Sequence, residues 1–203
     1  MLLAATVVGS GVMAENLAGG NVAIALLANT FATIGTLFVI IKLFAPISGA
    51  HFNPAVTFVV ALRGDLPRLD SIVYVAVQIV GCCIGTWLAH LMFQHNVLET
   101  SLHDRSGASQ LLSESVATFG LLLVVLGNPR PNESAQLVAA WIGAAYWFTA
   151  STSFANPAIT IARALTDTFA GIRPADAPAF IAAQLIGAVL ALGVARALFP
   201  RRT

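Results

Sequence analysis

The chain has 203 residues, of which 58% are hydrophobic and only 9% are charged. Because a soluble domain carries about 25% charged residues, this composition excludes a water-soluble protein and predicts a multi-pass membrane protein. The net charge of +1 argues against a nucleic-acid partner. Cys82 and Cys83 are neighbours in an apolar segment, so we expect free thiols and no disulfide between them.

Long apolar segments predict the transmembrane helices, each of which needs about 20 mostly apolar residues. Five segments fit this length, namely 22–44, 71–93, 110–127, 134–152 and 176–198. The apolar segment 1–13 covers only about 20 Å as a helix. We expect it to belong to a first transmembrane helix that begins upstream of this chain. The prediction is therefore six transmembrane helices.

Two shorter apolar segments, about 53–62 and 156–166, each begin with Asn-Pro-Ala and end at polar residues. About ten helical residues cover only about 15 Å, half the hydrocarbon core. Irregular backbone at this depth is tolerated only where protein buries it or water lines it. We therefore predict two re-entrant loops, each carrying a half-helix.

The two halves of the chain repeat each other. "NPAVTFVVAL" at 53–62 matches "NPAITIARAL" at 156–165, and "VQIVG" at 77–81 matches "AQLIG" at 183–187. We predict a first repeat over 1–106 and a second over 107–203, each with three spans and one half-helix. An odd number of spans inverts the second repeat, which places the two half-helices face to face near the bilayer midplane.

Charged residues predict the orientation. One side of the six-span arrangement carries Arg63, Arg68, Arg130, Arg201 and Arg202. The other side carries Arg105 and Arg173 together with five acidic residues, Glu15, Glu99, Asp104, Asp167 and Asp176. By the positive-inside rule both termini are expected in the cytoplasm. Small residues, Gly81 with Gly85 and Gly187 with Ala191, predict close helix contacts.

The Asn-Pro pairs explain how a polar turn is tolerated inside an apolar chain. Pro54 and Pro157 suit the first turn of a helix, where no amide donor is needed. Asn53 and Asn156 then take the N-cap position and satisfy amides that would otherwise be unpaired. Two helix N-termini, each worth about half a positive charge, would face a passing solute. Such a constriction suits a small neutral polar solute and repels cations.

These motifs, with "SGAHFNPAVT" and six spans, resemble the aquaporin superfamily of major intrinsic proteins over essentially the whole chain apart from the first helix. The resemblance implies an all-α membrane protein, a right-handed bundle of six transmembrane helices plus two re-entrant half-helices in an inverted repeat. It also implies a homotetramer in a lipid bilayer, with one pore per subunit. The implied pore motifs are Asn53, Pro54, Ala55, Asn156, Pro157 and Ala158. The family further places His51 beside the pore and uses a carboxylate, here Glu114, to hold re-entrant backbone.

The chain departs from the family at the outer constriction. Most members follow the second Asn-Pro-Ala with arginine, whereas this chain has Ile159. By the family's spacing, the other constriction positions are Thr33, Ala144 and Ser153. All four side chains are small or medium, so we predict a wide and weakly polar selectivity filter. Arg163, one turn further out, is either a displaced filter arginine in the vestibule or an interfacial anchor.

The missing arginine leaves cation rejection to the rest of the pore. Two half-charges about 5 Å from an ion, at an effective dielectric of about 20, oppose a cation by about 3 kcal/mol in total. Desolvation of the ion adds to this barrier. We therefore expect sodium to be excluded, with proton exclusion less well protected.

The predicted function is passive transport of small neutral solutes across the inner (plasma) membrane, with no enzymatic activity, cofactor or metal. The open filter and the "NPAITIARALTDTFAGIRP" context resemble bacterial aquaglyceroporins associated with arsenic resistance, which favours arsenite and glycerol-like solutes. A water, glycerol or urea facilitator is the alternative. A secondary transporter would share the inverted repeat, but it should carry coupling acids within the membrane, and only Lys42 and Glu114 lie in or near spans.

Overall fold

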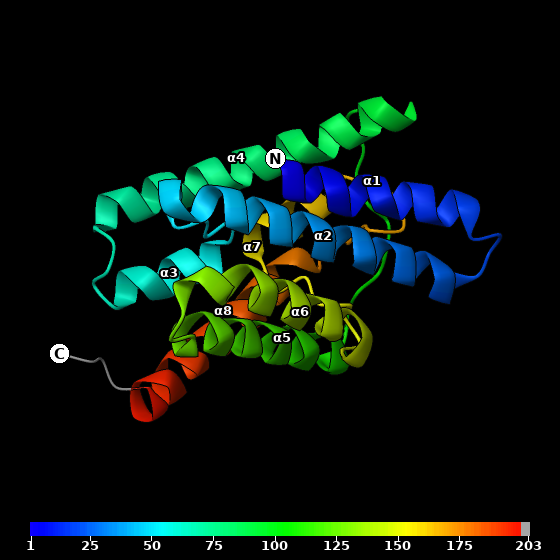
Figure 1. Cartoon of the computed structure of the whole chain (residues 1–203). Helices are drawn as coiled ribbons and strands as arrows, with labels where there is room; N and C mark the ends of the chain where they lie inside the picture. The colour runs from blue at the N-terminus through cyan, green and yellow to red at the C-terminus, as the bar shows by residue number, and fades with distance from the viewer. Residues whose placement is uncertain (200–203) are drawn as a thin grey trace.

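The computed structural model describes residues 1–199 and is helical throughout this part of the chain wherever it is regular (Figure 1). Arg201 and Arg202, which entered the orientation argument, lie outside the described residues. The helices are α1 (Leu2–Leu17), α2 (Val22–Ser48), α3 (Pro54–Leu62), α4 (Arg68–Phe93), α5 (Ala108–Gly127), the short 3₁₀ helix η1 (Pro131–Glu133), α6 (Ser134–Phe148), α7 (Pro157–Arg163) and α8 (Ala177–Leu198).

The expected spans appear as helices, but two of them are short. Within the described residues, α2, α4, α5 and α8 are long and apolar enough to cross a membrane. With 16 and 15 residues, α1 and α6 measure about 24 and 22 Å, less than the hydrocarbon core of about 30 Å. The predicted span 134–152 was too long, because α6 ends at Phe148 and the chain then turns toward the second half-helix.

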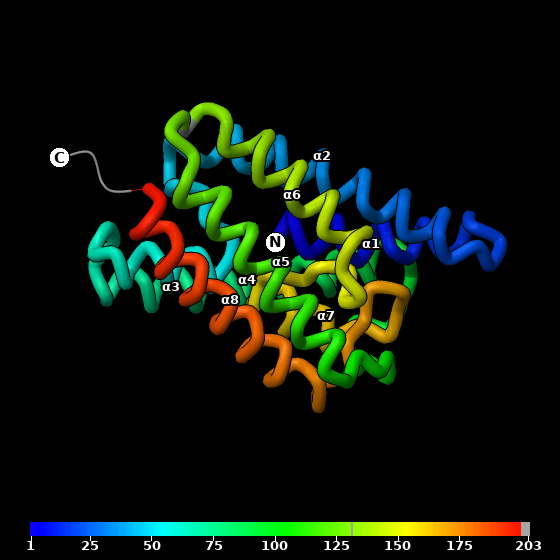
Figure 2. Tube along the Cα trace, turned by 90° about the horizontal axis from the view of Figure 1, so that it is seen from below, coloured from blue at the N-terminus to red at the C-terminus, as the bar shows by residue number. Residues whose placement is uncertain are grey.

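Helix packing follows an inverted repeat, which confirms that part of the predicted fold. In one half α1 packs against α2 and α4, and in the other α5 packs against α6 and α8. Each half-helix also reaches across: α7 packs against α4, while α3 packs against α8. The half-helices α3 and α7 touch each other inside the bundle, as the two perpendicular views show (Figures 1 and 2). The structure does not test the predicted boundary at 106/107.

The connections gather at the two ends of the bundle and carry most of the charged side chains. The α3–α4 and α5–α6 connections lie at one end with the C-terminal part of α8, and they carry Arg63 and Arg130 (Figures 1 and 2). The 94–107 and 164–176 connections lie at the other end. There Arg173 forms ion pairs with Asp104 and Asp176, at 3.2 and 3.0 Å. At the first end Arg63 pairs with Asp65 and Arg130 with Glu133, both at 2.9 Å, so acids accompany the arginines at both ends.

Small residues bring the long helices together. At Gly85 of α4, an added Cβ would lie only 3.0 Å from the Cβ of Ala4 in α1. At Gly187 of α8, an added Cβ would overlap the backbone carbonyl of Ser115 in α5. The hydroxyl of Ser115 donates to the carbonyl oxygen of Ala183 at 2.9 Å, which fixes the two helices at this distance. The predicted role of these glycines as close-contact sites is confirmed.

Gly187→Ala should therefore destabilise the bundle. The new methyl meets backbone, which cannot rotate away, so we expect a loss of about 1–3 kcal/mol and a lower thermal midpoint in detergent. Gly193→Ala in the same helix is the matched control, because nothing lies within 4 Å of its Cβ position. Equal thermal midpoints for the two variants would contradict the close contact between α5 and α8.

Candidate pore

Both half-helices begin at an asparagine cap, as their sequences predict. The side-chain oxygen of Asn53 accepts from the amide of Ala55 at 2.9 Å. That of Asn156 accepts from Ala158 and Ile159 at 3.0 and 3.3 Å. These bonds pair amides at the helix N-termini that would otherwise be unsatisfied in the middle of the bundle.

The same asparagines join the two halves of the chain. The amide nitrogen of Asn53 donates to the carbonyl oxygen of Ala155 at 2.7 Å. The amide nitrogen of Asn156 donates to the carbonyl oxygen of Phe52 at 2.9 Å. Each carbonyl belongs to the residue that precedes the opposite asparagine. Since a primary amide has two N–H groups, each asparagine keeps one for another partner.

These crossed hydrogen bonds require unusual backbone in both re-entrant loops. Phe52 and Ala155, the two accepting residues, have φ of 48° and 46°. Ala50 and Ser153, three residues before each asparagine, have φ of 49° and 52°. Non-glycine residues in this region cost about 1–3 kcal/mol each, and they persist only where the surroundings hold them. The matched positions show that both loops turn in the same way.

Glu114 holds the second loop. Its fully buried carboxylate accepts from the amides of Phe154 and Ala155, both at 2.9 Å, and from the Nε2 group of Gln184 at 2.6 Å. Gln184 also donates to the hydroxyl of Thr160 in α7 at 2.9 Å. The carboxylate is thus occupied by structural donors, which is the role that the family resemblance implied for it.

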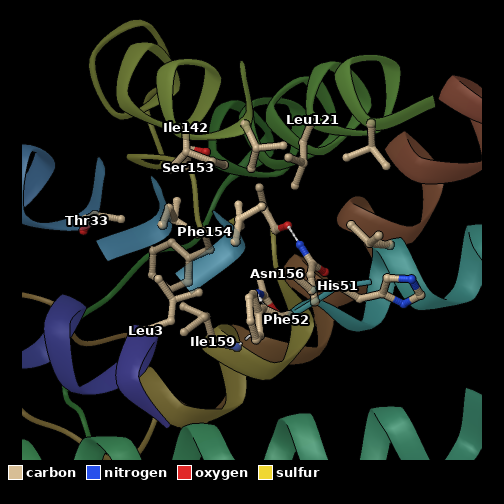
Figure 3. A pocket seen from close by; sticks show the side chains of 18 of the residues that line it. Leu3, Thr33, His51, Phe52, Leu121, Ile142, Ser153, Phe154, Asn156 and Ile159 are labelled. Carbon is tan, nitrogen blue, oxygen red and sulfur yellow. Dashed lines mark hydrogen bonds between the residues drawn. The ribbon is translucent and has the colours of Figure 1, made fainter. Parts of the chain in front are cut away.

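A cavity of about 200 Å³ runs past the asparagines (Figure 3). Beside α3 it is lined mainly by aliphatic side chains of α2, α3, α5 and α6, with His51 and Ser134 as polar members. Beside α7 the lining includes the polar side chains of Thr33, Tyr146 and Ser153. Within the described residues, the cavity wall contains no Asp, Glu, Lys or Arg. Two re-entrant half-helices around such a passage define a membrane channel.

The structure brings three of the four predicted filter residues to the cavity. Thr33, Ser153 and Ile159 line it, and each is at most 4% exposed. Ala144 does not line it but lies exposed on the outer surface of α6, so this assignment was wrong. In its place α6 presents Ile142 and Tyr146 to the cavity.

The filter wall offers free hydrogen-bonding capacity. The hydroxyls of Thr33 and Tyr146 lie 3.3 Å apart, and Thr33 donates to the carbonyl oxygen of Asn29, so Tyr146 is the donor of the shared bond. The Tyr146 oxygen can then accept from a solute. The hydroxyl of Ser153 is buried without a hydrogen-bond partner among the described residues. The side chains of Ile142 and Ile159 contribute apolar surface to the same wall.

The two residues predicted at the vestibule are placed differently. His51 lines the cavity, and its Nδ1 lies 3.1 Å from the hydroxyl of Thr57. Arg163 is 4% exposed and is not part of the cavity wall. As the last residue of α7 it turns into the following connection, where its Nε donates to the carbonyl oxygen of Ala170. This burial does not fit the alternative of an interfacial anchor, and the role of Arg163 in the outer vestibule stays a prediction.

Three residues at this site were missed from the sequence. Tyr146 and Phe154 line the cavity, and Arg105 lies against the ring of Phe154, 5.0 Å from its centroid. Tyr146 lies four residues after Ile142, so a search for residues one helical turn apart in α6 would have found this face. For Arg105 the sequence gives no signal, because it lies in a polar connection among other charged residues.

Comparisons with known proteins agree with this architecture. The family model described as "Major intrinsic protein" matches residues 1–155, so the chain belongs to the major intrinsic protein family. It is 53% identical over 197 residues to aquaglyceroporin AqpS of Rhizobium meliloti, covering 96% of this chain and 84% of that protein. It is 29% identical to an uncharacterized aquaporin-like protein of Haemophilus influenzae, over 77% of this chain and 85% of that protein.

Structural similarity extends over nearly the whole chain. The X-ray structure of the aquaglyceroporin from Plasmodium falciparum superposes with a TM-score of 0.70 at 19% identity, covering 98% of this chain and 93% of that one. This likeness supports the fold alone. The family match and the 53% identity to an aquaglyceroporin support a membrane channel for small neutral solutes.

Glu114→Gln should weaken the second loop. Glutamine has the same shape, but its NH₂ group would face amide donors, so one hydrogen bond becomes a repulsive contact. We expect a loss of about 1–3 kcal/mol in stability and a lower solute flux per folded channel. The control is Glu133→Gln, whose partner is Arg130 on the surface and whose loss should cost at most about 1 kcal/mol. A Glu114→Gln protein as stable and active as this control would contradict the structural role.

Proposed function

We propose that the protein is a passive channel for uncharged polyhydroxy solutes, with arsenous acid and glycerol as representative substrates. The observation that carries the proposal is Ile159 in the cavity wall, at the position where most family members have arginine. Without that long side chain, the passage beside α7 is bordered by Ile142, Thr33 and Ser153. Water passes through such an opening too.

The polar groups in the wall match a solute with several hydroxyls. Tyr146 offers an acceptor, Ser153 offers both a donor and an acceptor, and the two asparagines each keep one N–H. A neutral trihydroxy molecule can donate and accept at each of these points in turn. The described wall contains no ionised side chain, so a neutral solute does not have to displace the strongly bound water of a charged group as it passes.

A secondary transporter is the competing class, and the placement of the two candidate coupling residues disfavours it. Glu114 accepts hydrogen bonds from three donors at 2.6 to 2.9 Å. Lys42 is exposed on the outside of α2. Neither contacts the cavity, whereas a coupling residue must alternate between states in contact with the pathway. Flux that stays proportional to the solute gradient supports a channel, and flux that saturates supports a carrier.

The oligomeric state, the membrane and the orientation of the channel are also part of the proposal. We propose a homotetramer in the bacterial inner membrane with the α3–α4 and α5–α6 connections in the cytoplasm. Among the described residues in and beside the connections, that end has three arginines and three acids, whereas the other end has two arginines and five acids, which supports the orientation. The family and the many exposed apolar side chains on the long helices support the assembly and the membrane setting. Cross-linking in lipid and accessibility of cysteines placed in the connections test both statements.

The filter assignment is tested by Ile159→Arg. The long side chain narrows the passage, and its charge adds about 4 kcal/mol against a cation at about 4 Å and an effective dielectric of about 20. We expect proteoliposome light scattering to show glycerol and arsenous-acid flux falling much more than water flux, with any proton leak falling too.

Ile159→Leu is the matched control, because it keeps volume and polarity nearly unchanged. Its flux ratios should stay close to those of the parent protein. If Ile159→Arg leaves the ratio of glycerol to water flux unchanged in a folded channel, then Ile159 does not border the route of the solute.

A further inference from the structure

Two arginines lie against one aromatic ring of the pore wall. The guanidinium carbon of Arg163 is 3.4 Å from the centroid of Phe154, and that of Arg105 is 5.0 Å from it. Phe154 itself lines the cavity beside α7 and precedes Asn156 by two residues. The cationic groups at this height of the pore therefore lie behind the wall, while the wall position Ile159 is uncharged.

Arg163 and Arg105 differ in their burial and in their hydrogen bonds. Arg163 is 4% exposed, and its Nε donates to the carbonyl oxygen of Ala170, so it supports the connection after α7. Arg105 is only partly buried. Its Nε donates to the carbonyl oxygen of Gly171 at 2.7 Å, and one Nη donates to that of Ser151 at 3.3 Å. Its other Nη group has no hydrogen-bond partner within residues 1–199, so this end of Arg105 remains available.

The connection that carries Arg105 is held across the end of the pore. The amide of Ser101 donates to the carbonyl oxygen of Ala164 at 3.1 Å, and the amide of Arg173 donates to that of His103 at 2.7 Å. The amide of Arg105 itself donates to the carboxylate of Asp176 at 3.0 Å. These bonds hold Arg105 and the residues just before it against the 164–176 connection. They fix it between Ser151, just before the filter residue Ser153, and Gly171 on the opposite connection.

We propose that Arg105 determines charge selectivity at the outer mouth, supplying from the 94–107 connection the positive charge that the filter position Ile159 lacks. This inference rests on the proposed neutral-solute channel and names a residue that limits what else enters it. A cation that approaches the opening beside Phe154 meets a guanidinium held in place by two hydrogen bonds, to the carbonyl oxygens of Gly171 and Ser151. Neutral solutes are not repelled, and the lumen stays wide because the arginine approaches from behind the ring.

Burial lowers the pKa of Arg105 only to about 10, so the side chain remains charged at neutral pH. Two carboxylates lie near Arg105: Asp176 accepts from the backbone amide of Arg105 and from the side chain of Arg173, and Glu114 attracts the guanidinium, which acts to raise its pKa. Glu114 accepts three donors deeper in the bundle. The guanidinium also lies over the face of Phe154, an arrangement that is favourable for a cation.

Arg105→Gln tests the inference, because it removes the charge and keeps an amide donor. In proteoliposomes we expect the sodium and proton permeability to rise by about tenfold or more, because a unit positive charge beside the opening is lost. Glycerol flux should stay within about twofold of the parent channel. Arg105→Lys keeps the charge and should restore cation exclusion, although lysine cannot reproduce both hydrogen bonds.

Two further variants separate charge at the mouth from general effects. Arg130→Gln removes an exposed arginine at the opposite end of the bundle, where Arg130 pairs with Glu133, and its sodium and proton permeability should equal that of the parent channel. Adding Ile159→Arg to Arg105→Gln should lower the sodium and proton permeability again. Thermal midpoints, measured on every variant, identify any that lose the fold.

An Arg105→Gln channel that is folded and as tight to cations as its parent would overturn the inference. So would equal leaks in Arg105→Gln and Arg105→Lys, because packing and not charge would then be responsible. Both results leave the neutral-solute channel intact. That broader proposal fails only if the parent protein carries no glycerol or arsenous acid in the same assay.

Discussion

The crossed hydrogen bonds between Asn53 and Ala155 and between Asn156 and Phe52 are the constraint on which the pore depends. Each asparagine caps its own half-helix and binds the loop of the other, so neither loop is complete alone. The bonds hold two helix N-termini at the same point of the bundle, where their partial positive charges add. They also leave one N–H of each amide unused at that point. One pair of side chains thus sets the geometry, the electrostatics and the hydrogen-bonding capacity of the constriction.

Different side chains hold the strained backbone of the two re-entrant loops in place. In the second loop the carboxylate of Glu114 receives two backbone amides, and Gln184 connects it to Thr160 of α7. The first loop has its corresponding threonine, Thr57, bound by Gln78 at 3.0 Å and by His51 at 3.1 Å. Because a charged acceptor binds amides more strongly than a neutral one, the second loop has the stronger support. It is also the loop that carries the filter residues Ser153 and Ile159.

Local patterns allowed the caps, the half-helices and the lining position of Ile159 to be predicted, since each depends on residues within one or two turns. Ala144 was misplaced because alignment by spacing left the rotation of α6 undetermined. A shift of two residues turns a side chain by about 200°, from the pore to the lipid. Arg105 and Arg163 depend on how the 94–107 and 164–176 connections fold together, which no short-range pattern encodes. The Arg163 side chain is oriented by its hydrogen bond to the carbonyl oxygen of Ala170, seven residues further along the chain.

In the function that we propose, the distribution of charge lets a wide filter select against ions. The described cavity wall is free of ionised groups, so a neutral solute meets only hydroxyls, amides and apolar carbon there. A cation meets the two helix ends, which oppose it by about 3 kcal/mol at an effective dielectric of about 20. It also loses hydration that the aliphatic surface of α2 and α3 cannot replace. An arginine placed in the lumen adds its charge to this barrier, but its side chain also occupies the space that a larger solute needs. Placing guanidinium groups behind Phe154 separates the two effects, because Coulomb repulsion acts through the ring whereas steric exclusion does not. The size limit and the charge barrier of such a channel are therefore set by different residues.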